Sequence, residues 1–272
     1  MRFSRIPLNF IRKKETMKRI LIFSIIALVA LGATAQKPKY RLVWKENFGG
    51  KELRNDRWSK IPRGSSDWNN FMTNDDRCYN LADGKMTLLG IVNDCLPQDT
   101  APYLTGGIYT REKFNITHGK VEVKARLTGA QGAWPAIWML PENAPWPDGG
   151  EIDIMERLNY DAKVYQTVHS HYTFTLKKKE PASSDTAPIK PEKYNVYAVE
   201  ILPDSLVFSV NGRHTFTYPR IETPHKGQFP FGTPFYLLID MQIEGRWVGK
   251  ANPEELPAKM IVDWVKFYEL KK

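Results

Sequence analysis

Long apolar runs and cysteines are both scarce in this sequence. The one marked apolar run extends from Ile20 to about Leu31, too short to span a bilayer comfortably, and no second such run follows it. We therefore expect no transmembrane anchor. Cys78 and Cys95 are the only cysteines, so the sequence has no cysteine cluster of the kind that binds zinc. Convincing helical periodicity is absent as well, which argues against a helical fold.

The first 35 residues have the organisation of a secretory signal. Lys18-Arg19 precede the apolar run, and the small residues Ala33-Thr34-Ala35 follow it. We expect cleavage after Ala35 and export of residues 36–272 to the periplasm or out of the cell, with no cysteine at the new N-terminus to carry a lipid. A second methionine opens a signal of ordinary size by itself, so residues 1–16 are interpreted as an over-extended gene start.

The net charge of +9 indicates a polyanionic partner only while this leader is counted. Residues 1–35 contain seven Lys and Arg against one Glu, so their removal leaves +3 for the exported chain. We therefore expect no nucleic acid as a partner. In an exported protein the pair Cys78 and Cys95 predicts one disulfide. Two buried free thiols are the alternative.

Strand-forming sequence dominates the exported chain. No repeat, Ser/Gly linker or composition break divides it, and all-β domains of 200 to 250 residues are common, so we expect one domain over residues 36–272. Asn211-Gly212 predicts a tight hairpin turn. With 12% aromatic residues, the best architecture is all-β, with two antiparallel sheets packed as a sandwich or jelly roll. The clearest predicted strands, by alternation or β-branched content, are 119–126, 164–171, 195–201, 205–210 and 259–268.

Three carboxylates are concentrated in one predicted strand, Gly149-Gly-Glu-Ile-Asp-Ile-Met-Glu-Arg157. Glu151 and Asp153 alternate with two isoleucines, so they share one face of the strand. Glu156 is out of phase by one residue. A β-bulge at Ile154-Met155 would restore the phase and place all three acids on one face.

Three like charges on one face repel one another, and the repulsion raises at least one pKa. Glycoside hydrolysis uses such a difference, because one carboxylate attacks the anomeric carbon while a protonated one serves the leaving oxygen. Alternate positions on a strand are ~7 Å apart, and the glutamates can lean inward to the ~5 to 5.5 Å of a retaining mechanism. In a helix, Glu151 and Glu156 would point about 140° apart. A solvated acidic strand face is the remaining alternative.

Aromatic and polar residues flank the acidic strand in the sequence. Trp134 and Trp146 stand beside prolines in predicted loops, where they are candidates to line a sugar-binding groove. Trp138 is a candidate for the same groove or for the core. Gln242 and Trp247 end a later strand and are expected to reach the groove, although an edge strand with a Gly-rich turn explains them equally well.

Two histidines follow the acidic strand. His169 and His171 alternate, so one strand face would carry both, available to a substrate or a carboxylate. Zinc binding is the rival interpretation, and the sequence has no H-E-x-x-H motif to support it. A Ser-His-Asp hydrolase is disfavoured because no G-x-S-x-G turn is present.

These motifs together resemble glycoside hydrolase family 16. Glu151-Ile-Asp-Ile-Met-Glu156 is similar to the catalytic signature of that family in its bulged form. The flanking segments that agree are Trp134-Pro-Ala-Ile-Trp-Met-Leu-Pro141, Thr167-Val-His169 and Val262-Asp-Trp-Val-Lys-Phe-Tyr268. With weaker matches from Trp44 onward, the resemblance covers essentially the whole exported chain.

The resemblance implies a concanavalin-like β-jelly-roll with a concave substrate groove and a retaining mechanism within β-linked polysaccharides. Glu151 would be the nucleophile, Asp153 the assisting carboxylate and Glu156 the general acid/base. His169, Trp134 and Trp138 match positions that line the catalytic subsites. No cofactor is required, but some members bind a structural calcium, and Asp263 matches one of its ligands. Nothing in the sequence requires more than a monomer.

Departures from the family pattern bear on the substrate. Laminarinase-like members usually show W-G-N-N-E-L-Q-Y, where this sequence has Trp68-Asn-Asn70-Phe-Met72, so the pair after the asparagines has become wholly apolar. Asn70 remains a substrate-binding candidate. This change, and Glu244-Gly-Arg-Trp247 in place of the usual Gly-Gly before the late Trp, weaken a β-1,3-glucanase assignment. The segments Arg157-Leu-Asn159 and Asp240-Met-Gln242 resemble instead members that are endo-β-1,4-galactosidases acting on N-acetyllactosamine-containing mucin O-glycans or keratan-type chains. An endo-β-1,3(4)-glucanase, a transglycosylase with the same two glutamates and a non-catalytic carbohydrate-binding jelly roll are the alternatives.

Overall fold

The computed structural model describes residues 38–94 and 98–271, and Lys39–Lys272 form one compact unit. The predicted signal segment, residues 1–35, lies outside the described residues. The strands are β1 (Tyr40–Glu46), β2 (Ser59–Lys60), β3 (Tyr79–Ala82), β4 (Lys85–Val92), β5 (Tyr103–Thr105), β6 (Gly107–Tyr109), β7 (Gly119–Leu127), β8 (Ala133–Pro141), β9 (Glu151–Glu156), β10 (Lys163–His169), β11 (Ser184–Pro188), β12 (Asn195–Ile201), β13 (Ser205–Val210), β14 (Arg213–Pro219), β15 (Phe235–Ile243) and β16 (Ala258–Leu270). The helical segments are single turns, η1 (Asp76–Cys78), η2 (His171–Thr175) and η3 (Pro253–Glu255). None of the described helices is long and apolar enough to cross a membrane.

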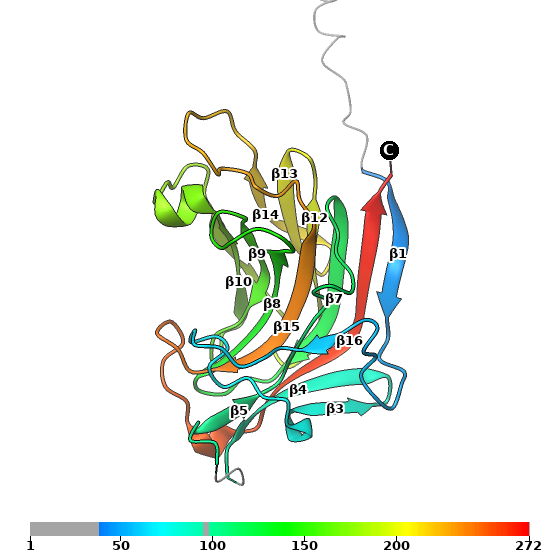
Figure 1. The fold of residues 1–272 in the computed structure, drawn as a ribbon, viewed down its shortest axis with the longest axis vertical. Helices are drawn as coiled ribbons and strands as arrows, with labels where there is room; N and C mark the ends of the chain where they lie inside the picture. The colour runs from blue at the N-terminus through cyan, green and yellow to red at the C-terminus, as the bar shows by residue number, and fades with distance from the viewer. Residues whose placement is uncertain (1–37, 95–97, 272) are drawn as a thin grey trace, which may run out of the picture. The chain divides into compact units, whose positions relative to one another are not determined.

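The strands form two open antiparallel sheets, as the sequence predicts (Figure 1). The outer sheet has the order β14-β13-β12-β7-β16-β4-β3, with β1 added beside β16 and β5 beside β4. The groove sheet has the order β11-β10-β9-β8-β15-β6-β2. This arrangement places the acidic strand β9 near the middle of the groove sheet, between β8 and β10.

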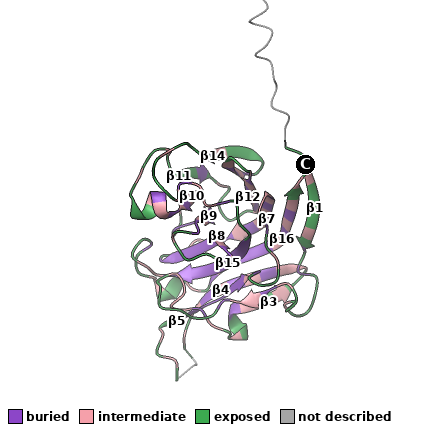
Figure 2. Cartoon of the chain, turned by 45° about the horizontal axis from the view of Figure 1, so that its top comes forward, coloured by how far each residue is buried: buried purple, intermediate pink, exposed green. Residues whose placement is uncertain are grey.

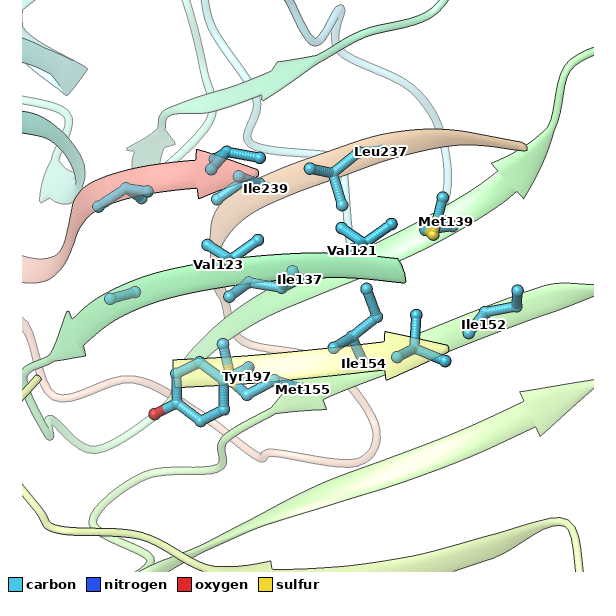
Figure 3. Close-up of a cluster of buried hydrophobic side chains, with 14 of the residues drawn as sticks. Val121, Val123, Ile137, Met139, Ile152, Ile154, Met155, Tyr197, Leu237 and Ile239 are labelled. Carbon is cyan, nitrogen blue, oxygen red and sulfur yellow. The ribbon is translucent and has the colours of Figure 1, made fainter. Parts of the chain in front are cut away.

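The core lies between the two sheets (Figures 2 and 3). Strand β7 shows how the sequence builds it, because its residues alternate between buried and half-buried positions. Val121 and Val123 point inward, while Lys and Glu side chains face outward. Figure 3 shows these valines against Ile137 and Ile239 of the groove sheet. Burying each such side chain stabilises the fold by roughly 1.5 to 3 kcal/mol.

The predicted strands are found with small shifts at their ends, with one exception. Asn211 and Gly212 join β13 to β14 with φ angles of 53° and 75°, the left-handed pair that a tight hairpin turn requires. The prediction that His169 and His171 share a strand face is wrong. Strand β10 ends at His169, because Ser170 caps a π-helical turn that begins at His171.

Cys78 is a free cysteine, fully buried at the end of η1. This contradicts the predicted disulfide, whose second member, Cys95, lies outside the described residues. Burial raises the pKa of the Cys78 thiol to about 12, so the thiol behaves as a small apolar side chain. Its environment explains the difference, since a buried thiol needs no partner to satisfy it.

Strand β9 contains the predicted bulge. Asp153 pairs with Trp138 of β8 and Met155 pairs with the preceding Ile137, which leaves Ile154 as an extra residue. Ile154 and Met155 are both fully buried and both belong to the core between the sheets (Figure 3). Two consecutive side chains on one face shift the phase of the strand, so Glu156 returns to the face of Glu151 and Asp153.

A buried amide links this bulge to the outer sheet. Gln166 of β10 is fully buried, and its Nε2 donates to the Ile154 carbonyl oxygen at 3.1 Å. Thr215 of β14 donates through Oγ1 to Gln166 Oε1 at 2.6 Å. The bulge therefore has a hydrogen-bond partner that the regular ladder does not supply.

Replacing this amide tests its role. Gln166→Leu leaves the buried Ile154 carbonyl unpaired, so we expect a loss of about 1 to 3 kcal/mol in the free energy of unfolding and a lower kcat. Thr215→Val, which removes only the outer hydrogen bond, should cost less in both. Urea unfolding and steady-state kinetics measure the two effects. Equal stability of Gln166→Leu and the unaltered protein would show that the amide does not hold the bulge.

Candidate active site

Two glycines set the start of the acidic strand. Gly150 has a φ angle of +90°, and a Cβ there would meet Phe231 Cε1 at 2.7 Å. Only glycine accepts both constraints without strain. Gly149 and Gly150 also close turns onto the carbonyls of Pro145 and Pro147, so the loop that carries Trp146 folds back beside Glu151.

Glu151, Asp153 and Glu156 line one groove with a volume of about 700 Å³. Their side chains are largely buried: Glu151 is 16% exposed and Asp153 is 4% exposed, and Glu156 is buried as well. The predicted face with three carboxylates is therefore present, opposite the face that packs into the core.

Burial shifts the acidity of all three carboxyl groups. It is the largest cause in each case, and it raises the pKa of Glu151 to about 8, that of Asp153 to about 7 and that of Glu156 well above its usual value. The charge of Asp153 raises the pKa of both glutamates further. The group therefore retains protons near neutral pH, which a general acid requires.

Two neighbouring side chains lower the pKa of the glutamates, Trp134 by a hydrogen bond and His169 by its charge. Trp134 Nε1 donates to Glu156 Oε1 at 2.9 Å and lowers the pKa of that carboxyl group. His169 Nε2 lies 3.4 Å from Asp153 Oδ2 and 3.8 Å from Glu151 Oε1, and it favours ionisation of Glu151. One carboxylate can thus ionise while another stays protonated.

A fourth carboxyl group, Asp240 of β15, lies beneath the groove. It is fully buried and accepts from Trp138 Nε1 at 2.8 Å and from Gln242 Nε2 at 2.7 Å. Burial raises its pKa to about 7, and its charge raises the pKa of Asp153. The sequence analysis did not predict a buried carboxyl group at this position. The single acid in the apolar run from Tyr236 to Met241 could have indicated one.

Aromatic residues form two walls around the acids. On one side Trp247 stands edge-on to Trp134, with ring centres 5.7 Å apart, and also contacts Tyr165. On the other side Trp146 stands edge-on to Phe174 of η2 at 4.5 Å. Trp146 and Trp247 are each 47% exposed, so each offers an apolar surface to a sugar ring.

A loop before η1 completes the groove. Trp68 packs edge-on against Trp138 at 4.7 Å, which makes Trp138 both a groove residue and part of a small apolar cluster. Asp67 Oδ2 accepts from the Arg246 backbone N–H at 3.4 Å, and this contact ties the loop to the Trp247 turn.

The groove brings together most of the residues that the sequence predicted. It is lined by the predicted Trp134, Trp138, Trp146, His169, Gln242 and Trp247, and by the unpredicted Ser66, Asp67, Trp68, Ala136, Leu140, Thr167 and Phe174.

Two of the sequence candidates lie elsewhere. Asn70 does not line the groove, because Asn69 holds the turn through Ser66 N–H and Trp68 takes the groove position. His171 does not line the groove and pairs with Asp148, its Nδ1 lying 2.9 Å from Oδ1.

One group of three described side chains has the composition and spacing of a metal site. Glu151, Asp153 and His169 have ligand atoms within 4.8 Å of one another, a spacing that a cation could bridge. His171 does not join them, which removes one ligand from the zinc interpretation. Asp263 belongs to no such group, and its Oδ2 lies 2.7 Å from Lys124 Nζ. Calcium there would have to displace this ammonium group and stays a prediction.

Comparison with known proteins identifies the family. Residues 67–266 match the profile of glycosyl hydrolases family 16. A β-glucanase from Rhodothermus marinus is 30% identical over 280 residues, which cover 96% of this chain and 97% of that protein. The chain therefore belongs to glycoside hydrolase family 16. It is an endo-acting glycosidase of a family with a retaining, two-glutamate mechanism.

Other relatives differ in what they act on. A keratan-sulfate endo-1,4-β-galactosidase from Sphingobacterium multivorum is 35% identical over 244 residues, covering 87% of this chain but only 57% of that protein. The laminarinase of Rhodothermus marinus superimposes with a TM-score of 0.77 at 26% identity, over 87% of this chain and all of that one. A structure from work on endo-acting O-glycanases that human gut bacteria express to initiate mucin breakdown gives 0.75 at 28%, over 85% of this chain and all of that one.

The buried Asp240 predicts a pH dependence of stability. A carboxyl group whose pKa is higher in the folded state binds more protons when folded, so stability falls as pH rises from about 4 through about 7. Asp240→Asn removes this titration and keeps both hydrogen bonds if the Gln242 amide turns over. We expect the variant to gain up to about 4 kcal/mol over the unaltered protein at pH 9, and little at pH 4.

Urea unfolding at the two pH values measures this difference. Glu269→Gln, which removes an exposed carboxylate paired with Arg41, serves as the control and should show no such pH-dependent gain. If Asp240→Asn is equally destabilised at both pH values, the carboxyl group ionises freely in the fold and the assignment of its raised pKa is wrong.

Proposed function

We propose that this protein is an exported, retaining endo-β-1,4-galactosidase that cleaves N-acetyllactosamine-containing chains, such as mucin O-glycans or keratan-type glycans. The observation that carries the catalytic part is the bulge that places Glu151, Asp153 and Glu156 on one groove face. The 35% identity to a keratan-sulfate endo-1,4-β-galactosidase supports the substrate. Export rests on residues 1–35, and N-terminal sequencing of protein from the periplasm or the medium, expected to begin at Gln36, checks it.

The proposed reaction uses the two glutamates in turn. Glu151 attacks the anomeric carbon while Glu156 donates a proton to the departing glycosidic oxygen. The covalent glycosyl-enzyme is then hydrolysed by a water molecule that Glu156, now ionised, deprotonates. Asp153, between them on the same face, keeps the proton affinity of both glutamates high through its charge.

The loop near the groove supports the galactosidase assignment. Laminarinase-like members carry Glu-Leu where this chain has Phe71 and Met72, so a polar residue is replaced by an apolar one. Met72 is fully buried in an apolar cluster, and Phe71 packs edge-on against Tyr103 at 5.6 Å. Neither side chain lines the groove, so the glutamate of the laminarinase pattern has no polar counterpart at this place in the chain.

An endo-β-1,3(4)-glucanase is the second candidate. It is favoured by the Rhodothermus marinus β-glucanase, which matches over 97% of its own length. The same groove would then hold a glucan, and the roles of the two glutamates would be unchanged.

Product analysis separates the candidates. The chain from residue 36 onward is incubated with mucin O-glycans, keratan-type chains, laminarin and mixed-linkage β-glucan, and the products are identified by mass spectrometry. Oligosaccharides with galactose at the reducing end are expected. Gluco-oligosaccharides would support the glucanase instead, and longer rather than shorter products would indicate a transglycosylase. Glu151→Gln is the control for contaminating activity, and binding without cleavage by the unaltered protein would support a carbohydrate-binding role.

A further inference from the structure

A second cavity adjoins the groove at the far end of β8 and β15. It has a volume of about 400 Å³ and shares Leu140 and Trp146 with the groove. Its other polar and aromatic side chains are Arg111, Glu142, Asn143 and Tyr236, none of which belongs to the groove. Tyr236 pairs with Leu140 across the two strands. A group attached to a sugar in the groove can therefore reach this cavity past Trp146.

Arg111 presents an unused cation to the cavity. Its side chain is exposed, and its guanidinium carbon lies 5.8 Å from the centre of the Tyr236 ring. No hydrogen bond or ion pair joins it to any described residue. The guanidinium is therefore held over an aromatic ring with its N–H donors free.

Glu142 places a carboxylate in the wall of the same cavity. Its Oε1 accepts from the Glu112 backbone N–H at 2.8 Å, which fixes the carboxylate. Its Oε2 is shielded from solvent and has no hydrogen-bond partner among the described residues. A buried acceptor without a partner is costly, and Arg111 and Glu142 do not relieve each other by pairing.

We propose that this cavity, the side pocket, binds a neutral monosaccharide branch on the glycan chain that occupies the groove. Sugar hydroxyls both donate and accept, so they complement the free guanidinium donors of Arg111 and the carboxylate of Glu142 together. Trp146 and Tyr236 supply aromatic walls for the apolar face of a sugar. A sulfate or carboxylate would gain from Arg111 but would be repelled by Glu142. The inference rests on the proposed function and specifies its substrate as a branched chain.

The test compares kcat/KM for three matched oligosaccharides: an unbranched chain, the same chain with a neutral monosaccharide branch, and the same chain with sulfate at that position. In Arg111→Gln and Glu142→Gln the ratio of branched to unbranched kcat/KM should fall about tenfold, since each loses a charged hydrogen bond. Glu142→Gln keeps a side-chain carbonyl oxygen that accepts from the Glu112 backbone N–H. Arg220→Gln is the matched control, an exposed arginine 4.8 Å over Phe229 that lines neither cavity, and its ratio should not change.

An unchanged ratio in both variants would overturn the proposal, as would an Arg111-dependent preference for the sulfated chain. Calorimetric titration of Glu151→Gln with the three chains, with and without Arg111→Gln, gives the same comparison as binding. If no chain is cleaved, the proposed function fails, and the binding ratio still decides whether the side pocket selects a branch.

Discussion

The extra residue in β9 is the constraint on which the active site depends. Without it, a strand of this sequence would send Glu156 into the core between the sheets. The bulge instead places Ile154 and Met155 consecutively in that core and returns Glu156 to the groove. Gln166 satisfies the freed carbonyl from the neighbouring strand. Apolar packing on one face thus determines the positions of the acids on the other.

The same aromatic residues bind the acids and shape the groove. Trp134 and Trp138 each donate an indole N–H to a buried carboxyl group, Glu156 and Asp240, while their rings line the groove. A buried carboxylate needs such donors, because burial without hydrogen bonds is costly. The indole rings meet this need and still leave an apolar face for a sugar. This explains why the sequence concentrates tryptophans around its acids.

Periodic features were predictable from sequence, and features of irregular segments were not. Alternation identified the strands, and one out-of-phase glutamate identified the bulge. Asn70 and His171 were misplaced because turn geometry, not alternation, orients them. Phe174 lies on a π-helical turn, which no periodicity of apolar residues in the sequence predicts. The side pocket joins segments distant in the sequence, so only the folded chain reveals that Arg111 and Glu142 are neighbours.

The most direct test of this account is to trap the covalent intermediate with a 2-deoxy-2-fluoro glycoside of the cleaved sugar and locate it by peptide mass spectrometry. The fluorine slows both steps by destabilising the oxocarbenium-like transition state, and a good leaving group allows the glycosyl-enzyme to accumulate. The account predicts one adduct, on Glu151. An adduct on Glu156 would reverse the two roles, and efficient turnover without any adduct would contradict a retaining mechanism on this strand.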